Sequence, residues 1–168
     1  LQLDFPGGPA VSKLAAQGNR KAYSFPRSLI HDPKDDFSFS GLKTAVRYAI
    51  VGPGQQDFSK VSLSQEAKAD LCASFEAAVV DVLVAKSERA LLRCGYKRLI
   101  VGGGVAANTY LREQLRESSQ RNAYELIIAP LQWCTDNAVM GALALEKIER
   151  GEFASLDLDI TPGLQRGF

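Results

Sequence analysis

Apolar residues recur at helical intervals over the longest periodic stretch of the chain, Ser64–Arg93. They follow the three- and four-residue steps of one helix face: Leu71, Phe75, Ala78, Val79, Val82 and Leu83. From Ala77 to Ala85 the stretch is apolar nearly all round, so we expect a helix buried between layers. Ser62 or Ser64 can cap its start, and Ser62 with Gln65 fits a capping box.

Two short apolar runs predict buried strands. Arg98–Val101 is followed at once by three glycines, and Leu126–Ala129 is stopped by Pro130. The spacing predicts a helix between them over Ala106–Ser119 and a last helix over Asp136–Arg150. We expect the last helix to end at Gly151 and to turn three apolar residues inward: Val139, Leu143 and Ala144.

The first third of the chain predicts less regular structure. Leu1–Gly18 reads as a turn and a short helix, and Arg20–Asp36 as a polar connector. Phe37–Phe39 alternates apolar and polar residues, which indicates an extended stretch. The residues that follow have helical spacing, and Gly52 ends that segment. We expect the tail, Asp157–Phe168, to be a loop.

The order of these elements is typical of an α/β fold that is helix-rich and has few parallel strands. Two strands make a poor sheet against helices of this size. Further strands must therefore come from unseen chain, from a partner, or from weaker segments such as Phe37–Phe39.

Composition narrows the class of protein. The chain has 168 residues, 46% of them hydrophobic and 23% charged, and a net charge of +1, which predicts one ordinary globular unit. That balance excludes binding of nucleic acid by overall charge alone. No apolar run approaches the roughly 20 residues that span a bilayer, and no signal peptide begins the chain. Since it starts at Leu1, we expect a processed product, a recombinant segment or a piece of something longer.

Cysteine and histidine usage limits the redox and metal chemistry. Three cysteines without a C-x-x-C pair indicate a reducing compartment rather than a disulfide framework. With His31 as the single histidine, the chain cannot assemble a zinc site from the usual nitrogen and sulfur ligands by itself.

The glycines after the first predicted strand are the first candidate for chemistry. Gly102, Gly103 and Gly104 let backbone N–H groups approach a nucleotide, and the next helix offers its positive end to phosphate. Asn108 suits hydrogen bonding to a ribose or base. The alternative is a plain strand-to-helix turn with Asn108 near a cap. The spacing also matches the dinucleotide pattern G-x-G-x-x-A, but the acidic residue expected after the next strand is missing.

Asp136 is the second candidate. It either caps the last helix or points its carboxylate at a metal or phosphate site. Because it follows a strand, as the glycines do, the two could face one crevice. Weaker candidates are Gly7 with Gly8, where backbone could approach a ligand, and the segment Ser38–Lys43. A dyad of Cys134 with His31 is also conceivable, although a lone cysteine is more often structural.

Four sequence motifs occur in this order along the chain: Leu3–Pro9, Asp36–Ala45, Gly103–Asn108 with Leu111 and Arg112, and Cys134–Asn137. Together they resemble the tRNA N6-adenosine threonylcarbamoyltransferase family (TsaD/Gcp), formerly called O-sialoglycoprotein endopeptidases, of the bacterial or mitochondrial type. The resemblance implies an actin-like ATPase fold, related to sugar kinases, Hsp70 and ribonuclease H, with two lobes and a cleft between them.

The resemblance also implies the chemistry. Family members transfer threonylcarbamoyl from threonylcarbamoyl-AMP to N6 of the adenosine after the anticodon in tRNAs that read ANN codons. Carried over by motif, Asp136 would ligate one divalent metal ion, iron or zinc. Gly8, Gly103, Gly104 and Asn108 would contact the adenylate or an ATP-like ligand. Ser40 and Lys43 would line the cleft or contact tRNA phosphate.

Further implications concern partners and location. The resemblance implies tRNA as partner, TsaB-like and TsaE-like proteins, a homo- or heterodimer, no membrane and a cytoplasmic location. The family's H-x-x-x-H metal motif and its phosphate loop are missing from this chain. We therefore expect residues 1–168 to be a single unit, the C-terminal portion of a two-lobed protein whose N-terminal half is absent, and inactive alone.

Rival hypotheses come from other classes. A non-catalytic paralogue or scaffold would bind tRNA-modification partners without metal or nucleotide. A dinucleotide enzyme would bind NAD. A metal-dependent protease lacks its H-E-x-x-H motif here.

Overall fold

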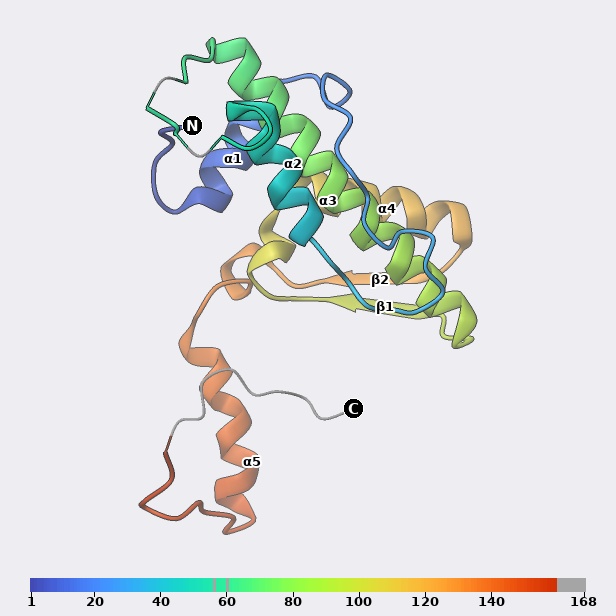
Figure 1. Cartoon of the computed structure of the whole chain (residues 1–168). Helices are drawn as coiled ribbons and strands as arrows, with labels where there is room; N and C mark the ends of the chain where they lie inside the picture. Colours follow the sequence, from blue (N-terminus) through green and yellow to red (C-terminus); the bar gives the residue numbers. More distant parts are fainter. Residues whose placement is uncertain (56, 60, 160–168) are drawn as a thin grey trace. The chain divides into compact units, whose positions relative to one another are not determined.

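One long helix carries most of the core in a computed structural model that describes residues 1–55, 57–59 and 61–159 (Figure 1). Helix α3 spans Gln65–Arg93, which confirms the predicted helix and its burial. The hydroxyl of Ser64, not Ser62, caps it by accepting from the Ala67 N–H at 3.1 Å. Residues on every side of α3 are buried, so it must be covered all round.

Two short helices cover the N-terminal half of α3. Helix α1 (Gly7–Ala15) packs through Ala15 against Cys72 and Ala73. Helix α2 (Ser40–Val51) inserts Leu42 into a second cluster with residues of α3 and the preceding connector. The small side chains that α3 presents to α1 allow the two helices to approach closely.

A small sheet covers the C-terminal half. Strands β1 (Arg98–Val101) and β2 (Glu125–Ile128) are parallel and joined through helix α4 (Thr109–Asn122). On one face, four strand residues pack on α3 and α4: Leu99, Val101, Leu126 and Ile128. The other face carries Ile100 and Ile127, which are register partners and 71% and 42% exposed.

The connector, residues 20–39, runs along α3 (Figure 1). Polar side chains of α3 hold it there. The Lys86 ammonium is almost fully buried and donates to the Lys34 carbonyl at 2.6 Å. The Arg89 guanidinium donates to the carbonyls of Ile30 and Asp32 at 2.8 and 2.6 Å. Because these donors satisfy backbone carbonyls, the connector is ordered without helix or strand.

Two expectations about elements that precede β2 are corrected. Phe37–Phe39 is no strand, since it leads directly into α2 with Phe39 at the N-cap. The helix predicted over Ala106–Ser119 is a 3₁₀ turn, η1 (Gly104–Ala107), followed by α4. The two are separate because Asn108 is extended, with φ −64° and ψ 122°, and starts α4 anew.

The chain divides into two compact units, Leu1–Cys134 and Thr135–Phe168. The first ends after a 3₁₀ turn, η2 (Leu131–Trp133). In the second, the helix predicted over Asp136–Arg150 is a 3₁₀ turn, η3 (Ala138–Ala142), and a short helix, α5 (Leu143–Glu149).

Two inward positions expected for that last helix are wrong, because Val139 and Ala144 are exposed. The side chain of Leu143 lies outside the description. Gly151 does follow the end of α5, with φ +68°. The predicted tail loop is described only to Asp159, and residues 160–168 lie outside the described residues. No helix among the described residues is long and apolar enough to cross a membrane.

Gly18 marks the closest approach of the N-terminal segment to α3. A Cβ there would lie 2.1 Å from the Ala69 carbonyl oxygen. Gly18→Ala should therefore lower the free energy of unfolding by about 1–3 kcal/mol, the usual cost of overpacking. Gly41→Ala is the matched control, since its Cβ would only touch Ser28 at 3.4 Å and helix propensity favours alanine. Urea denaturation of both variants measures this, and equal stabilities would contradict the close approach.

Candidate functional site

The glycine turn after β1 is exposed and open. Gly103 is the N-cap of η1 with φ +91°, a conformation that favours glycine. A Cβ at Gly102 or Gly103 would meet no atom within 4 Å, and one at Gly104 only the Cys134 carbonyl at 3.9 Å. Positive φ explains Gly103, whereas the described surroundings do not require glycine at its two neighbours. Space beside an exposed backbone is what a ligand approaching N–H groups needs.

Asn108 caps α4 and turns its amide inward. Its Oδ1 accepts from the Leu111 N–H at 2.8 Å. Its Nδ2 donates to Glu76 Oε1 at 2.7 Å and to Ser12 Oγ at 3.2 Å. The cap reading of Asn108 is confirmed, and a ligand role stays a prediction that must use whatever hydrogen-bonding capacity remains.

Glu76 is the residue of this region that the sequence reading missed. It is only 6% exposed and accepts from Ser12 Oγ at 2.8 Å as well as from Asn108. The Arg20 guanidinium lies 3.5 Å from its Oε2. The signal was present in the sequence, because a carboxylate inside an apolar helix needs buried partners.

The guanidinium of Arg20 also stacks on α4. Its central carbon lies 4.0 Å from the centre of the Tyr110 ring. Burial raises the pKa of the Tyr110 phenol, the Asp81 carboxylate raises it further, and the Arg20 charge opposes both. Tyr110 therefore remains a neutral phenol and packs beside the partly buried polar cluster around Glu76.

Gly8 lies in the first turn of α1 and is exposed, with no atom within 4 Å of a Cβ built there. Ser12 lies one helical turn further along α1 and contacts both Glu76 and Asn108. The fold thus brings the start of α1 and the glycine turn, which are about a hundred residues apart, to one part of the first unit.

Arg112 joins the two turns that follow the strands. Its Nε donates to the Ala106 carbonyl at 2.5 Å, and its Nη2 to the Ala129 carbonyl at 2.6 Å. The same Nη2 lies 3.3 Å from the sulfur of Cys134. This buried sulfur has Arg112 and two carbonyls as partners, so the described contacts do not support a dyad with His31.

The remaining predicted residues are not joined to that region. Ser40 and Lys43 are exposed on α2, and no described hydrogen bond or ion pair links them to the glycine turn. Asp136 is exposed and belongs to the second unit, in a segment without helix or strand before η3. The N-cap of α5 is Ala142, so the predicted cap role of Asp136 is wrong.

A metal site is not complete in the part of the chain that the structure describes. No group of three or more His, Cys, Asp or Glu side chains gathers there. One exposed carboxylate such as Asp136 does not hold a metal ion by itself. The described donor set therefore does not fit a resident metal.

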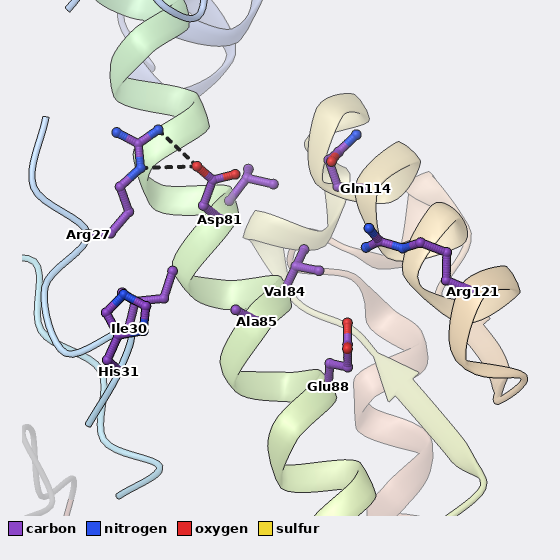
Figure 2. A pocket seen from close by; sticks show the side chains of 10 residues that line it. Arg27, Ile30, His31, Asp81, Val84, Ala85, Glu88, Gln114 and Arg121 are labelled. Atoms are coloured by element: carbon purple, nitrogen blue, oxygen red, sulfur yellow. Dashed lines mark hydrogen bonds and ion pairs between the residues drawn. The ribbon is translucent and has the colours of Figure 1, made fainter. Parts of the chain in front are cut away.

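A described groove lies elsewhere in the first unit (Figure 2). It is a groove of about 460 Å³ between the connector, α3 and α4. Its walls carry Ile30 and His31 from the connector, with Asp81 paired to Arg27 at 2.8 Å. No residue that the sequence predicts to bind the adenylate lines it.

Comparison with known proteins identifies the sequence family of this chain. The sequence pattern of the family TsaD, tRNA N6-adenosine threonylcarbamoyltransferase, matches residues 1–143. The chain belongs to the TsaD family. This match covers all four motif segments, including both the glycine turn and Asp136, so it confirms the resemblance seen in the sequence.

Curated TsaD relatives agree. A tRNA N6-adenosine threonylcarbamoyltransferase of Rhodopirellula baltica is 65% identical over 100% of this chain and 49% of its own length. Proteins of the same name from Bdellovibrio bacteriovorus and Thermotoga neapolitana are 45% and 43% identical. They are matched over 95% and 98% of this chain, and over 45% and 47% of their own lengths. The chain spans about half the length of these curated TsaD relatives.

The contact between Asn108 and Glu76 predicts which side chains are tolerated at residue 108. Asn108→Ser and Asn108→Asp both retain a helix-capping oxygen. The aspartate, however, would set a second carboxylate against that of Glu76, which lies 2.7 Å from the present amide nitrogen. We expect Asn108→Asp to be less stable than Asn108→Ser by roughly 1–3 kcal/mol, the cost of an unmet buried polar group. Chemical denaturation measures the difference, and the reverse order would refute the contact.

Proposed function

We propose that this chain is the C-terminal portion of an enzyme that transfers threonylcarbamoyl from threonylcarbamoyl-AMP to tRNA. The acceptor is N6 of the adenosine after the anticodon in tRNAs that read ANN codons. The observation that carries the proposal is the TsaD match over residues 1–143, supported by 65% identity to a curated transferase along the whole chain.

The proposed fold is that of a two-lobed, actin-like ATPase, of which both described units form one C-terminal portion. The sheet supports it. Parallel sheets are normally covered on both faces, and two strands alone are marginal. Here the face of Ile100 and Ile127 is exposed, and the chain spans about half the length of its relatives. We propose that further chain of the same protein covers this face.

The proposed adenylate site is the glycine turn together with the start of α1. Exposed backbone at Gly103 and Gly104 would approach the adenylate, and Gly8 would contact it from α1. Asn108 would bind the nucleoside. Nδ2 donates to Glu76 and Ser12, and Oδ1 accepts one described bond, so one lone pair of Oδ1 remains. Asn108 would therefore accept from a hydroxyl or amine of the ligand.

The transfer itself needs positioning above all. The N6 amine attacks the carbamoyl carbon, a C–N bond forms, the bond to the adenylate oxygen breaks, and AMP leaves while the amine loses a proton. Holding amine and mixed anhydride in contact can supply much of the rate. Backbone N–H groups of the glycine turn would hold the phosphate, which is the leaving group's charged end.

Asp136 is proposed as one ligand of the divalent metal, iron or zinc, that the family resemblance implies. Since the described donor set is not a site by itself, the other ligands would have to come from outside it, and no step is derived through the metal. Lys43 and Ser40, exposed on α2, would face tRNA phosphate. The activity also implies TsaB-like and TsaE-like partners and a cytoplasmic location.

A transfer assay tests the function. The complete gene product, with any sequence that flanks this chain, is incubated with threonylcarbamoyl-AMP and an ANN-reading tRNA. We expect modified tRNA and AMP. Asp136→Asn should lower the rate by more than about a hundredfold, since even outer partners of a metal site are worth roughly ten- to a hundredfold. Glu149→Gln, which removes another exposed carboxylate of the second unit, should leave it unchanged.

The outcomes separate the hypotheses. No transfer by the unmodified protein would refute the enzyme and favour the non-catalytic scaffold. Transfer with full activity in Asp136→Asn would refute the role of Asp136 alone. Metal analysis of both purified proteins distinguishes a lost ligand from a lost fold.

The uncovered sheet face yields a second test. In the complete gene product, Ile100→Ser should cost about 2–4 kcal/mol of unfolding free energy if further chain buries the face. Tyr96→Ser is the control, because Tyr96 is similarly exposed, at 69%, but lies before β1 and off its face. A change within about 0.5 kcal/mol for Ile100→Ser, as at an exposed position, would contradict the proposed covering.

A further inference from the structure

The carboxylate of Glu76 is the point where three segments of the first unit meet. Oε1 accepts from Ser12 of α1 at 2.8 Å and from Asn108 at 2.7 Å, and Oε2 lies 3.5 Å from Arg20 of the connector. The side chain is 6% exposed. Burying a carboxylate is costly, and an apolar residue of the same size is often at least as stabilising. Stability alone therefore does not explain why the Glu76 carboxylate is buried and hydrogen-bonded here.

Those bonds determine how Asn108 is oriented. The helix cap holds Oδ1, and Glu76 with Ser12 holds Nδ2. A carboxylate can only accept, so it forces the amide nitrogen inward and leaves the free lone pair of Oδ1 to a ligand. Without Glu76, the side-chain amide of Asn108 could rotate by half a turn and present its NH2 group, a hydrogen-bond donor, to the ligand.

The same carboxylate reaches the second proposed contact with the adenylate. Ser12 lies one turn after Gly8 on α1, and its hydroxyl is tied to Glu76 Oε1. Movement of Glu76 would therefore disturb both the start of α1 and the residue that follows the glycine turn.

We propose that Glu76 is a positioning residue of the adenylate site. It holds the amide of Asn108, and through Ser12 the start of α1, in the geometry that binds the ligand, without touching the ligand itself. The inference rests on the proposed function of Gly8 and Asn108.

A double-mutant cycle in the complete gene product tests it. Glu76→Ala and Asn108→Ala should each raise the KM for threonylcarbamoyl-AMP roughly tenfold, the lower end for a residue that supports a ligand contact. If Glu76 acts largely through Asn108, the KM of the double variant should fall below the product of the two single effects by more than about twofold, the usual error of additivity. Multiplying effects, or an unchanged KM in Glu76→Ala, would overturn the proposal.

Two further variants distinguish an effect on the site from a loss of folding. Glu76→Gln retains the shape of the side chain and replaces Glu76→Ala in the cycle if that variant does not fold. Glu88→Gln is the matched control, because Glu88 is also on α3 and accepts from a serine hydroxyl, that of Ser118 at 2.7 Å. It should leave the KM unchanged.

A readout without substrate separates this proposal from the function. With ¹⁵N-labelled asparagine, the side-chain amide signal of Asn108 is identified by its loss in Asn108→Ala. It should shift in Glu76→Gln and stay in place in Glu88→Gln. An unshifted signal in Glu76→Gln overturns the positioning role. If the unmodified protein transfers nothing, the proposed function fails, and this signal still decides whether Glu76 holds Asn108.

Discussion

The need to cover α3 on every side organises the first unit. An apolar helix of this kind is stable in water only when other elements remove its surface from solvent. Helices α1 and α2 do this for its first half, and the connector, α4 and the sheet for its second. Everything proposed to bind the adenylate is carried by elements that pack on this helix, so α3 is also the frame of the candidate site.

The polar residues of α3 show how the same helix directs irregular segments. Lys86 and Arg89 hold carbonyls of the connector, and Glu76 holds α1 and the cap of α4. Each is a charged group at least partly withdrawn from water, and such groups are tolerated when hydrogen-bonded. These side chains also hold loops in place that lack the repeating backbone hydrogen bonds of a helix or a sheet. The glycine turn and Asn108 lie on segments of this irregular kind, whereas Gly8 lies in α1.

Much of this fold could be predicted from the sequence, for a local reason. The apolar spacing of α3, the apolar run of β1 and the glycines after it depend on neighbours in the chain, and these elements were predicted closely. The break at Asn108 was not, because its backbone N–H closes η1 on the Val105 carbonyl while its side chain caps α4. Phe37–Phe39 alternates like a strand but pairs with neither β1 nor β2, and Phe39 packs instead against the cluster around Leu42 of α2.

In the candidate site too, some features depend on local sequence and others on tertiary packing. The sequence by itself determined the family, the glycine turn, and the candidacy of Gly8, Asn108 and Asp136, because order and residue type are enough for a motif. Only the tertiary structure decided that Asn108 turns its amide to Glu76 and Ser12. Such contacts join residues that lie 32 and 96 positions apart. Hydrogen-bond geometry across that separation is set by how α1, α3 and α4 pack, and no local pattern in the sequence encodes it.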